Sequence, residues 1–183
     1  MNEVIKAIFE RNSCRDFSGE PVSRETMELL SRAALAAPSA MNNQPWRIIC
    51  VLDKTLLDEM DKDGMQELKK DEAAYERIKA RGGKLFYNAP AAIIVLTDKK
   101  SAWGAHDSGI LIQNVALAAH SLGLGNVICG MARIPLEAPN SKWRERLGFG
   151  EFPDFDFVVS ILIGKANSGK TPHELDALKV KFI

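Results

Sequence analysis

Two stretches near the N-terminus decide the fold that this sequence predicts: Arg11-Asn12-Ser13-Cys14-Arg15-Asp16-Phe17 and Pro38-Ser39-Ala40-Met41-Asn42-Asn43-Gln44-Pro45-Trp46. The first places two guanidinium groups and a hydroxyl close together, and such groups bind phosphate oxygens well. The second is polar and bounded by prolines. Its hydroxyl and amide side chains, with free backbone N–H groups, suit the edge of a heteroaromatic ring that carries carbonyls and ring nitrogens. A phosphate and such a ring together indicate flavin mononucleotide (FMN).

Helical and strand patterns follow one another without strict βαβ alternation, which favours an α+β fold. Helices are expected up to Arg11, from Ser23 to Pro38, over 107–122 and over 142–147. Strands are expected at 47–52, 91–97, 126–130 and 155–164. The charge-rich stretch 53–84 predicts two mostly exposed helices broken near Gly64. The alternation in 178–183 predicts a strand that adds to a sheet edge, either in its own subunit or in a partner.

Composition predicts one globular domain spanning residues 1–183. The formal net charge of +0 gives no overall attraction to nucleic acid or to an anionic membrane. No apolar run is long enough to cross a bilayer and the first residues do not resemble a signal peptide, so we expect a cytoplasmic protein. The three cysteines and three histidines show no metal-ligand spacing, so no metal is expected.

The two opening stretches, in this order, resemble the nitroreductase family of FMN-dependent oxidoreductases. The family pattern is roughly Arg-Arg-Ser-x-Arg-x-Phe, followed by Pro-Ser-x-x-Asn-x-Gln-Pro-Trp. The resemblance covers nearly the whole chain and is weaker toward the C-terminus. Asn12 departs from the pattern, because a second basic residue is common there. The implied architecture is a nitroreductase-like mixed sheet flanked by helices, in a dimer.

The resemblance also implies which residues contact the flavin. Arg11 and Ser13 face the phosphate and ribityl chain, while Arg15 reaches the pyrimidine edge of the ring. The loop 38–45 contributes to the flavin site of the opposite subunit. The full set of expected cofactor-binding residues is Arg11, Asn12, Ser13, Arg15, Pro38, Ser39, Ala40, Met41, Asn42, Asn88, Cys129, Gly130, Met131, Lys165 and Lys170.

Several of these residues have ordinary alternatives. The two arginines could be surface charges, and Asn88 could simply be a turn residue before a strand. In the family a short glycine-containing segment here presents a backbone N–H toward flavin N5, and Cys129-Gly130-Met131 fits it because a residue without Cβ allows such close approach. In the family a basic residue after the last core strand contacts the phosphate, and Lys170 or Lys165 fills that role. No catalytic side chain is expected, since the flavin carries the redox chemistry.

Gly164-Lys165-Ala166-Asn167-Ser168-Gly169-Lys170-Thr171 matches the phosphate-binding pattern G-x-x-x-x-G-K-[ST] and follows a predicted strand. A nucleotide-binding P-loop must open a helix, however, and too few residues remain after Thr171 for the rest of a nucleotide site. We therefore prefer the flavin interpretation over an NTPase.

The resemblance implies a homodimeric NAD(P)H oxidoreductase. NADH or NADPH would pass hydride to flavin N5, and a nitroaromatic or quinone-type acceptor would then take its place, which is a ping-pong scheme. The apolar pattern around the whole helix 107–122 also indicates burial in a core or against a second subunit. Two alternatives stay open. One is another flavin reaction of the family, as in deiodinases, flavin-cleaving enzymes or cyclic-dipeptide dehydrogenases; the other is a non-catalytic FMN-binding domain.

Overall fold

The computed structural model describes residues 1–169 and 171–183 and is built around a four-stranded sheet. Its strands lie in the order β1 (Trp46–Val51), β2 (Ala91–Asp98), β4 (Phe155–Gly164) and β3 (Gly125–Cys129). Neighbouring strands are antiparallel, and parallel pairing occurs at one isolated bridge, between Ser13 and Asn126. The first stretch of the sequence is thereby attached directly to the edge strand β3.

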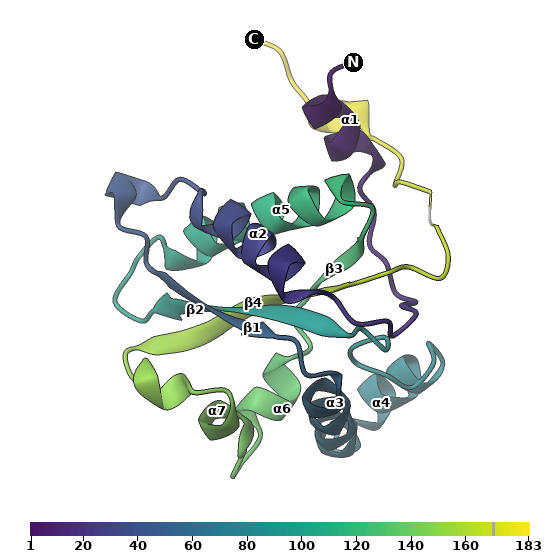
Figure 1. The fold of residues 1–183 in the computed structure, drawn as a ribbon, viewed down its shortest axis with the longest axis vertical. Coiled ribbons are helices and arrows are strands. Elements are labelled where there is room, and N and C mark those ends of the chain that lie inside the picture. The colour runs from purple at the N-terminus through teal and green to yellow at the C-terminus, as the bar shows by residue number, and fades with distance from the viewer. Residues whose placement is uncertain (170) are drawn as a thin grey trace.

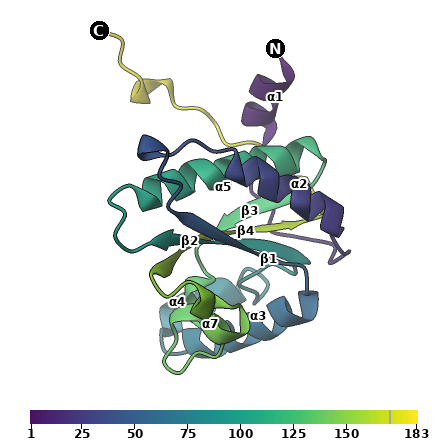
Figure 2. The ribbon, with the colours of Figure 1, turned by 60° about the vertical axis from the view of Figure 1, so that its left-hand side comes forward.

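Helices cover both faces of the sheet (Figures 1 and 2). One face carries α2 (Arg24–Leu35) and α5 (Gly104–Ser121); the other carries α3 (Lys54–Leu68), α4 (Glu72–Lys79), α6 (Arg133–Glu137) and α7 (Trp143–Arg146). Short 3-10 helices are η1 (Ala40–Asn42), η2 (Phe149–Glu151) and η3 (Ala177–Lys179). The α+β class predicted from the sequence is confirmed.

The central strand β2 is buried on both faces because two separate cores meet it. Ile93 and Val95 belong to the core beneath α2 and α5, whereas Ile94 and Leu96 belong to the core on the side of α3 and α6. Side chains alternate between the faces of a strand. The unbroken apolar run of β2 therefore fills both layers, as the buried strand predicted at 91–97 required.

The charged helical region differs from the sequence prediction at Gly64, where a break was expected. Helix α3 instead runs through Gly64 to Leu68, and α4 begins after Asp71, whose side chain accepts a hydrogen bond from the Ala74 N–H. A Cβ on Gly64 would lie 2.5 Å from Leu85 Cδ1. The glycine therefore serves close packing between the helix and the segment before β2, and it does not end the helix.

Helix α1 (Glu3–Glu10) and the C-terminal tail project from the same end of the body, as Figures 1 and 2 show. The helix begins at Asn2, whose side chain accepts from the Ile5 N–H, and its Val4 and Phe9 side chains are exposed. Within its own chain the segment 178–183 adds no strand to the sheet: the tail forms η3 and then extends, with Leu178 and Phe182 exposed. Pairing of this segment with the sheet of a partner subunit stays a prediction. Alternation alone could not form a strand there, since a strand needs a partner edge.

Candidate functional site

Three segments meet at the end of the sheet where β4 stops and β2 starts. Ser13 bridges Asn126, and the Cys14 N–H donates to the Asn126 carbonyl at 2.9 Å. Phe17, 1% exposed, pairs with Ala166 just beyond β4. The buried Phe17 thus anchors a polar stretch, whose Arg11, Asn12 and Ser13 are half-buried and whose Arg15 is exposed. Phe17 and Trp46 are core residues.

The turn before β2 lies against this stretch. Asn88 adopts a left-handed backbone conformation with φ of 64°, and its side-chain amide donates to the Phe17 carbonyl at 3.1 Å. Lys84 Nζ donates to Asn88 Oδ1 at 3.2 Å. Asn88 therefore holds two segments together in this chain, and Lys84 brings a further cation to the site.

A buried carboxylate holds the same turn from the opposite side. Asp61 on α3 accepts hydrogen bonds from the N–H groups of Leu85 and Phe86, at 3.2 Å and 2.8 Å. Burial raises the pKa of Asp61, and these two hydrogen bonds oppose that effect. The position of Lys84 and Asn88 therefore depends on a residue of α3 that the sequence did not single out.

The expected phosphate-binding cations differ in their availability. Within the described part of the chain, neither Arg11 nor Arg15 forms an ion pair, so both guanidinium groups are open to a ligand. Lys165 pairs with Glu20 at 2.9 Å on the surface. Lys170 lies outside the described residues. Asn12 donates its side-chain amide to the Glu10 carbonyl at the end of α1.

The second stretch lies at the opposite end of the sheet. Trp46 pairs with Thr97, and Thr97 pairs with Asp156 near the start of β4, whereas the first stretch meets the chain beyond Gly164. Figure 1 shows η1 at the left and the chain after α1 at the right. The ten-residue strand β4 separates them, and at about 3.3 Å per residue it spans about 30 Å. One chain therefore does not bring the two stretches together on one flavin.

Gly130 follows β3 on an open surface. The preceding Cys129 is 3% exposed, its carbonyl accepts from Ser160 Oγ at 2.6 Å, and burial raises the pKa of its thiol. A Cβ on Gly130 would meet nothing within 4 Å. The Gly130 backbone is accordingly free to lie against a flat ligand, while the buried Cys129 thiol is directed into the core.

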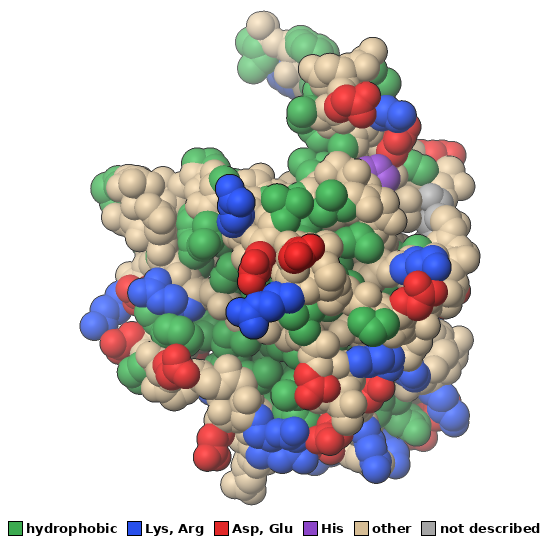
Figure 3. Space-filling view, viewed as in Figure 1, with side chains coloured by type: hydrophobic (Ala, Val, Ile, Leu, Met, Phe, Trp, Pro, Cys, Tyr) green, Lys and Arg blue, Asp and Glu red, His purple; other side chains and the backbone are tan. Residues whose placement is uncertain are grey.

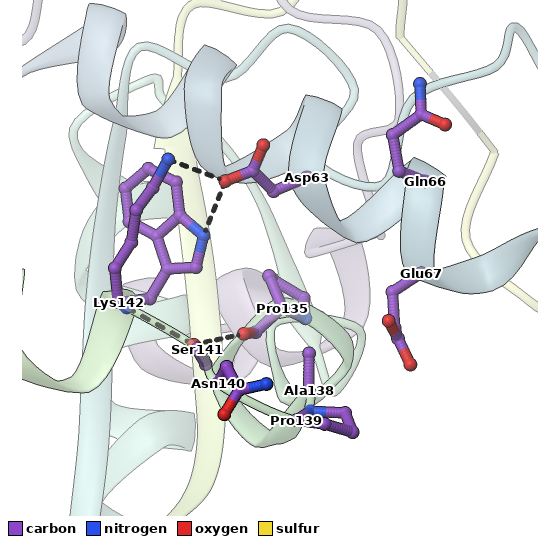
Figure 4. A pocket seen from close by; sticks show the side chains of 10 residues that line it. Asp63, Gln66, Glu67, Pro135, Ala138, Pro139, Asn140, Ser141 and Lys142 are labelled. Atoms are coloured by element: carbon purple, nitrogen blue, oxygen red, sulfur yellow. Dashed lines mark hydrogen bonds and ion pairs between the residues drawn. The ribbon is translucent and has the colours of Figure 1, made fainter.

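Other features of the described residues do not add to this site. Figure 4 shows a hollow of about 300 Å³ between α3 and the α6–α7 segment, lined by none of the expected cofactor-binding residues. Part of its polar lining is paired internally: Asp63 accepts from Trp143 Nε1 at 3.2 Å and from Lys142 Nζ at 3.0 Å. Among the described residues there is no group of three or more His, Cys, Asp or Glu side chains that could hold a metal, and no helix suited to crossing a membrane.

The P-loop interpretation of 164–171 finds no support in the described residues. Gly164 ends β4, and the Ser18 and Asn167 N–H groups tie the following segment to the first stretch. Apart from the short η3, the described residues after β4 contain no helix. A P-loop needs a helix whose N-terminal N–H groups hold the phosphate, and the described residues directly after the motif form no such helix.

Comparison with known proteins identifies the family. The sequence pattern of the Nitroreductase family matches residues 8–165. A crystal structure of a nitroreductase with bound FMN from Desulfitobacterium hafniense is 42% identical, has a TM-score of 0.92 and covers 100% of this chain and 99% of its own. An FMN-dependent nitroreductase from Clostridium difficile is 30% identical, has a TM-score of 0.84 and covers 100% and 99%.

A curated relative from Archaeoglobus fulgidus, provisionally named NADH dehydrogenase/NAD(P)H nitroreductase, is 34% identical over 88% of this chain and 85% of its own length. The chain belongs to the nitroreductase family. The resemblance drawn from the two opening stretches is thus confirmed.

Proposed function

We propose that this chain acts as a homodimeric, FMN-dependent NAD(P)H oxidoreductase that reduces nitroaromatic or quinone-type acceptors. Family membership and the FMN-bound relatives support the cofactor and the enzyme class. The separation of the two ligand-binding stretches carries the rest of the proposal. Each chain carries the first stretch at one end of its sheet and the second stretch at the other end. A second copy is needed to bring the first stretch of one chain to the second stretch of the other.

The exposed apolar side chains favour such a second copy. Leu29 and Leu35 of α2 are 47% and 52% exposed, and Ile110 of α5 and Leu122, which follows its last residue, are 43% and 45% exposed. Figure 3 shows hydrophobic side chains gathered over α1, the tail and α2, whereas charged side chains concentrate over the helices of the other face. Exposed apolar area on this scale favours association, and the formal net charge of +0 does not oppose it.

The residues at the first end of the sheet suit a flavin. Arg11 and Ser13 would hold the phosphate and the ribityl chain, and Arg15 would stabilise negative charge at the pyrimidine edge. The open backbone at Gly130 leaves room for the ring. Bound FMN supplies the hydride chemistry at N5. The chain would position the ring, and the nicotinamide and the acceptor would use one exposed ring face in turn.

The absorption spectrum of the purified protein tests this proposal. We expect a yellow protein with one FMN per chain that sediments as a dimer. Under anaerobic stopped-flow conditions, NADH or NADPH should bleach the flavin band, and a nitroaromatic or quinone should restore it. A colourless protein that binds no added FMN would overturn the proposal. If the bound flavin stays oxidised under excess NADH and NADPH, the protein binds FMN but does not have the proposed activity.

The same stopped-flow experiment distinguishes the proposed reaction from the other flavin reactions of the family. A halogenated phenol, free reduced flavin and a cyclic dipeptide should each be offered to the FMN-loaded protein beside a nitroaromatic compound. We expect the fastest turnover with the nitroaromatic or quinone. Faster turnover of one of the other compounds would assign this chain to a different reaction of the family while keeping its cofactor.

A further inference from the structure

The carboxylate of Asp107 joins α5 to the second stretch. Asp107 lies in the first turn of α5 and is 4% exposed. Its Oδ1 accepts a hydrogen bond from the Ala40 N–H at 3.2 Å. Its Oδ2 is also buried and forms no hydrogen bond with any described residue. The single hydrogen bond of this carboxylate within the described chain is therefore made to the loop and not to its own helix.

A buried carboxylate with one unmatched oxygen is costly to maintain. The N-terminal end of α5 offsets part of that cost through its dipole. The adjacent Ser108 is equally buried, at 0% exposed, but its Oγ donates within α5 to the Gly104 carbonyl at 2.7 Å. Ser108 thus satisfies its own helix, whereas Asp107 contributes its hydrogen bond to a segment far away in the sequence.

The segment that Asp107 holds is conformationally unfavourable by itself. Met41, Asn42 and Gln44 have φ values of 52°, 55° and 45°, in the left-handed region that residues with a Cβ rarely adopt. Such conformations persist when the surroundings hold them and are concentrated at ligand sites. Here Asp107 holds Ala40, and Ser39 Oγ accepts from the Gln44 N–H at 2.9 Å.

We propose that Asp107 is a positioning residue for the flavin: it fixes Ala40 so that Met41 and Asn42 keep the left-handed turn that presents this loop to the FMN of the second copy. This inference rests on the proposed function for the identity of the ligand. It adds to that function a named residue on α5 that controls the geometry of the half-site without touching the cofactor.

Amide hydrogen exchange on the full-length holoenzyme tests the anchoring step. In the wild-type protein we expect the Ala40 N–H to exchange at least about tenfold more slowly than an unprotected peptide amide, since it is hydrogen-bonded to a buried group. Asp107→Ala should remove this protection and speed exchange across 40–44. Asp107→Asn, which keeps an oxygen acceptor, should restore it, and Ser108→Ala should leave it unchanged. An unprotected Ala40 N–H in the wild-type protein would overturn the inference without any variant.

FMN affinity and the visible circular dichroism of the bound flavin test the positioning step. We expect the FMN dissociation constant to rise about tenfold in Asp107→Ala, the scale of one lost hydrogen bond, with an altered flavin dichroism. Asp107→Asn and Ser108→Ala should remain within about threefold of the wild-type value.

If the wild-type protein binds no FMN, the proposed function itself fails. If the wild-type protein binds FMN and Asp107→Ala binds it equally tightly, or if Asp107→Asn is as impaired as Asp107→Ala, the inference alone fails.

Discussion

The backbone of Gly164 lies directly against the ring of Pro90. A Cβ on Gly164 would be 2.5 Å from Pro90 Cδ and 3.2 Å from Phe17 Cδ1. This contact joins the end of β4, the start of β2 and the anchor of the first stretch at one point. The glycine that begins the apparent P-loop pattern is thus explained by packing and needs no nucleotide.

Replacing this glycine should destabilise the protein. We expect Gly164→Ala to lower the free energy of unfolding by about 2–3 kcal/mol, because the added methyl has no space between two rigid rings. Urea unfolding followed by circular dichroism measures the change. Gly150→Ala is the matched control, since a Cβ there meets nothing within 4 Å. Equal unfolding midpoints for the two variants would show that the Gly164 contact is not restrictive.

Removing the Arg11 guanidinium should weaken cofactor binding and leave folding intact. We expect Arg11→Ala to cost about 1–3 kcal/mol of FMN binding, the range for a charge-assisted hydrogen bond. Fluorescence titration with FMN measures it. Arg24→Ala is the control, because Arg24 forms an exposed ion pair with Glu28 on α2, away from the proposed phosphate site. An unchanged FMN dissociation constant in Arg11→Ala would remove Arg11 from the phosphate site.

Stability should depend on pH through Asp61. Burial raises the pKa of this carboxyl in the folded protein, so the folded state binds the proton more tightly than the unfolded state. The resulting stabilisation is complete below the pKa of the unfolded chain and is lost as pH rises through the folded pKa. We therefore expect the unfolding free energy of the wild-type protein, relative to Asp61→Asn, to fall as pH rises above about 4, the ordinary pKa of an aspartate in the unfolded chain. A difference that stays constant or grows with pH would contradict this assignment.

The three thiols should differ in their reactivity. Cys14 and Cys129 are 4% and 3% exposed, whereas Cys50 is exposed. Partial burial of its sulfur raises the pKa of the Cys50 thiol. With a chromogenic disulfide reagent we expect one thiol to react in the native protein, slowly at neutral pH and faster as the thiolate forms. Cys50→Ser should abolish this reaction; rapid native reaction of a second thiol would contradict the packing around Cys14 or Cys129.

The sequence predicted the elements whose pattern is set by local chemistry. The apolar run of β2, the Ser23 cap of α2 and the all-apolar pattern of α5 were sufficient to place these elements within a few residues. Gly64 was misjudged because a glycine that permits close packing and a glycine that ends a helix look alike without the neighbouring Leu85. The C-terminal segment forms no strand within its own chain, because strand pairing needs a partner edge that an alternating pattern cannot supply.

The two opening stretches indicated the ligand, but not the residues that support them. Asp61 and Asp107 each hold a loop through backbone N–H groups that are distant in sequence. Asp61 lies in a charge-rich helix where a buried carboxylate has no distinguishing pattern. Asp107 at the start of the apolar α5 was the one available signal, since a carboxylate beside a continuous apolar run requires a partner.

The central claim is that one flavin is held by the first stretch of one copy and the second stretch of another. Co-expression of an Arg11→Ala chain with an Asn42→Ala chain, each carrying a different affinity tag, tests it most directly. In the purified mixed dimer one site combines both changes and the other has neither. The account predicts that about half of the FMN binds with wild-type affinity, whereas each variant alone binds FMN weakly. Uniformly weak binding in the mixed dimer would contradict it, because both stretches would then act within one chain.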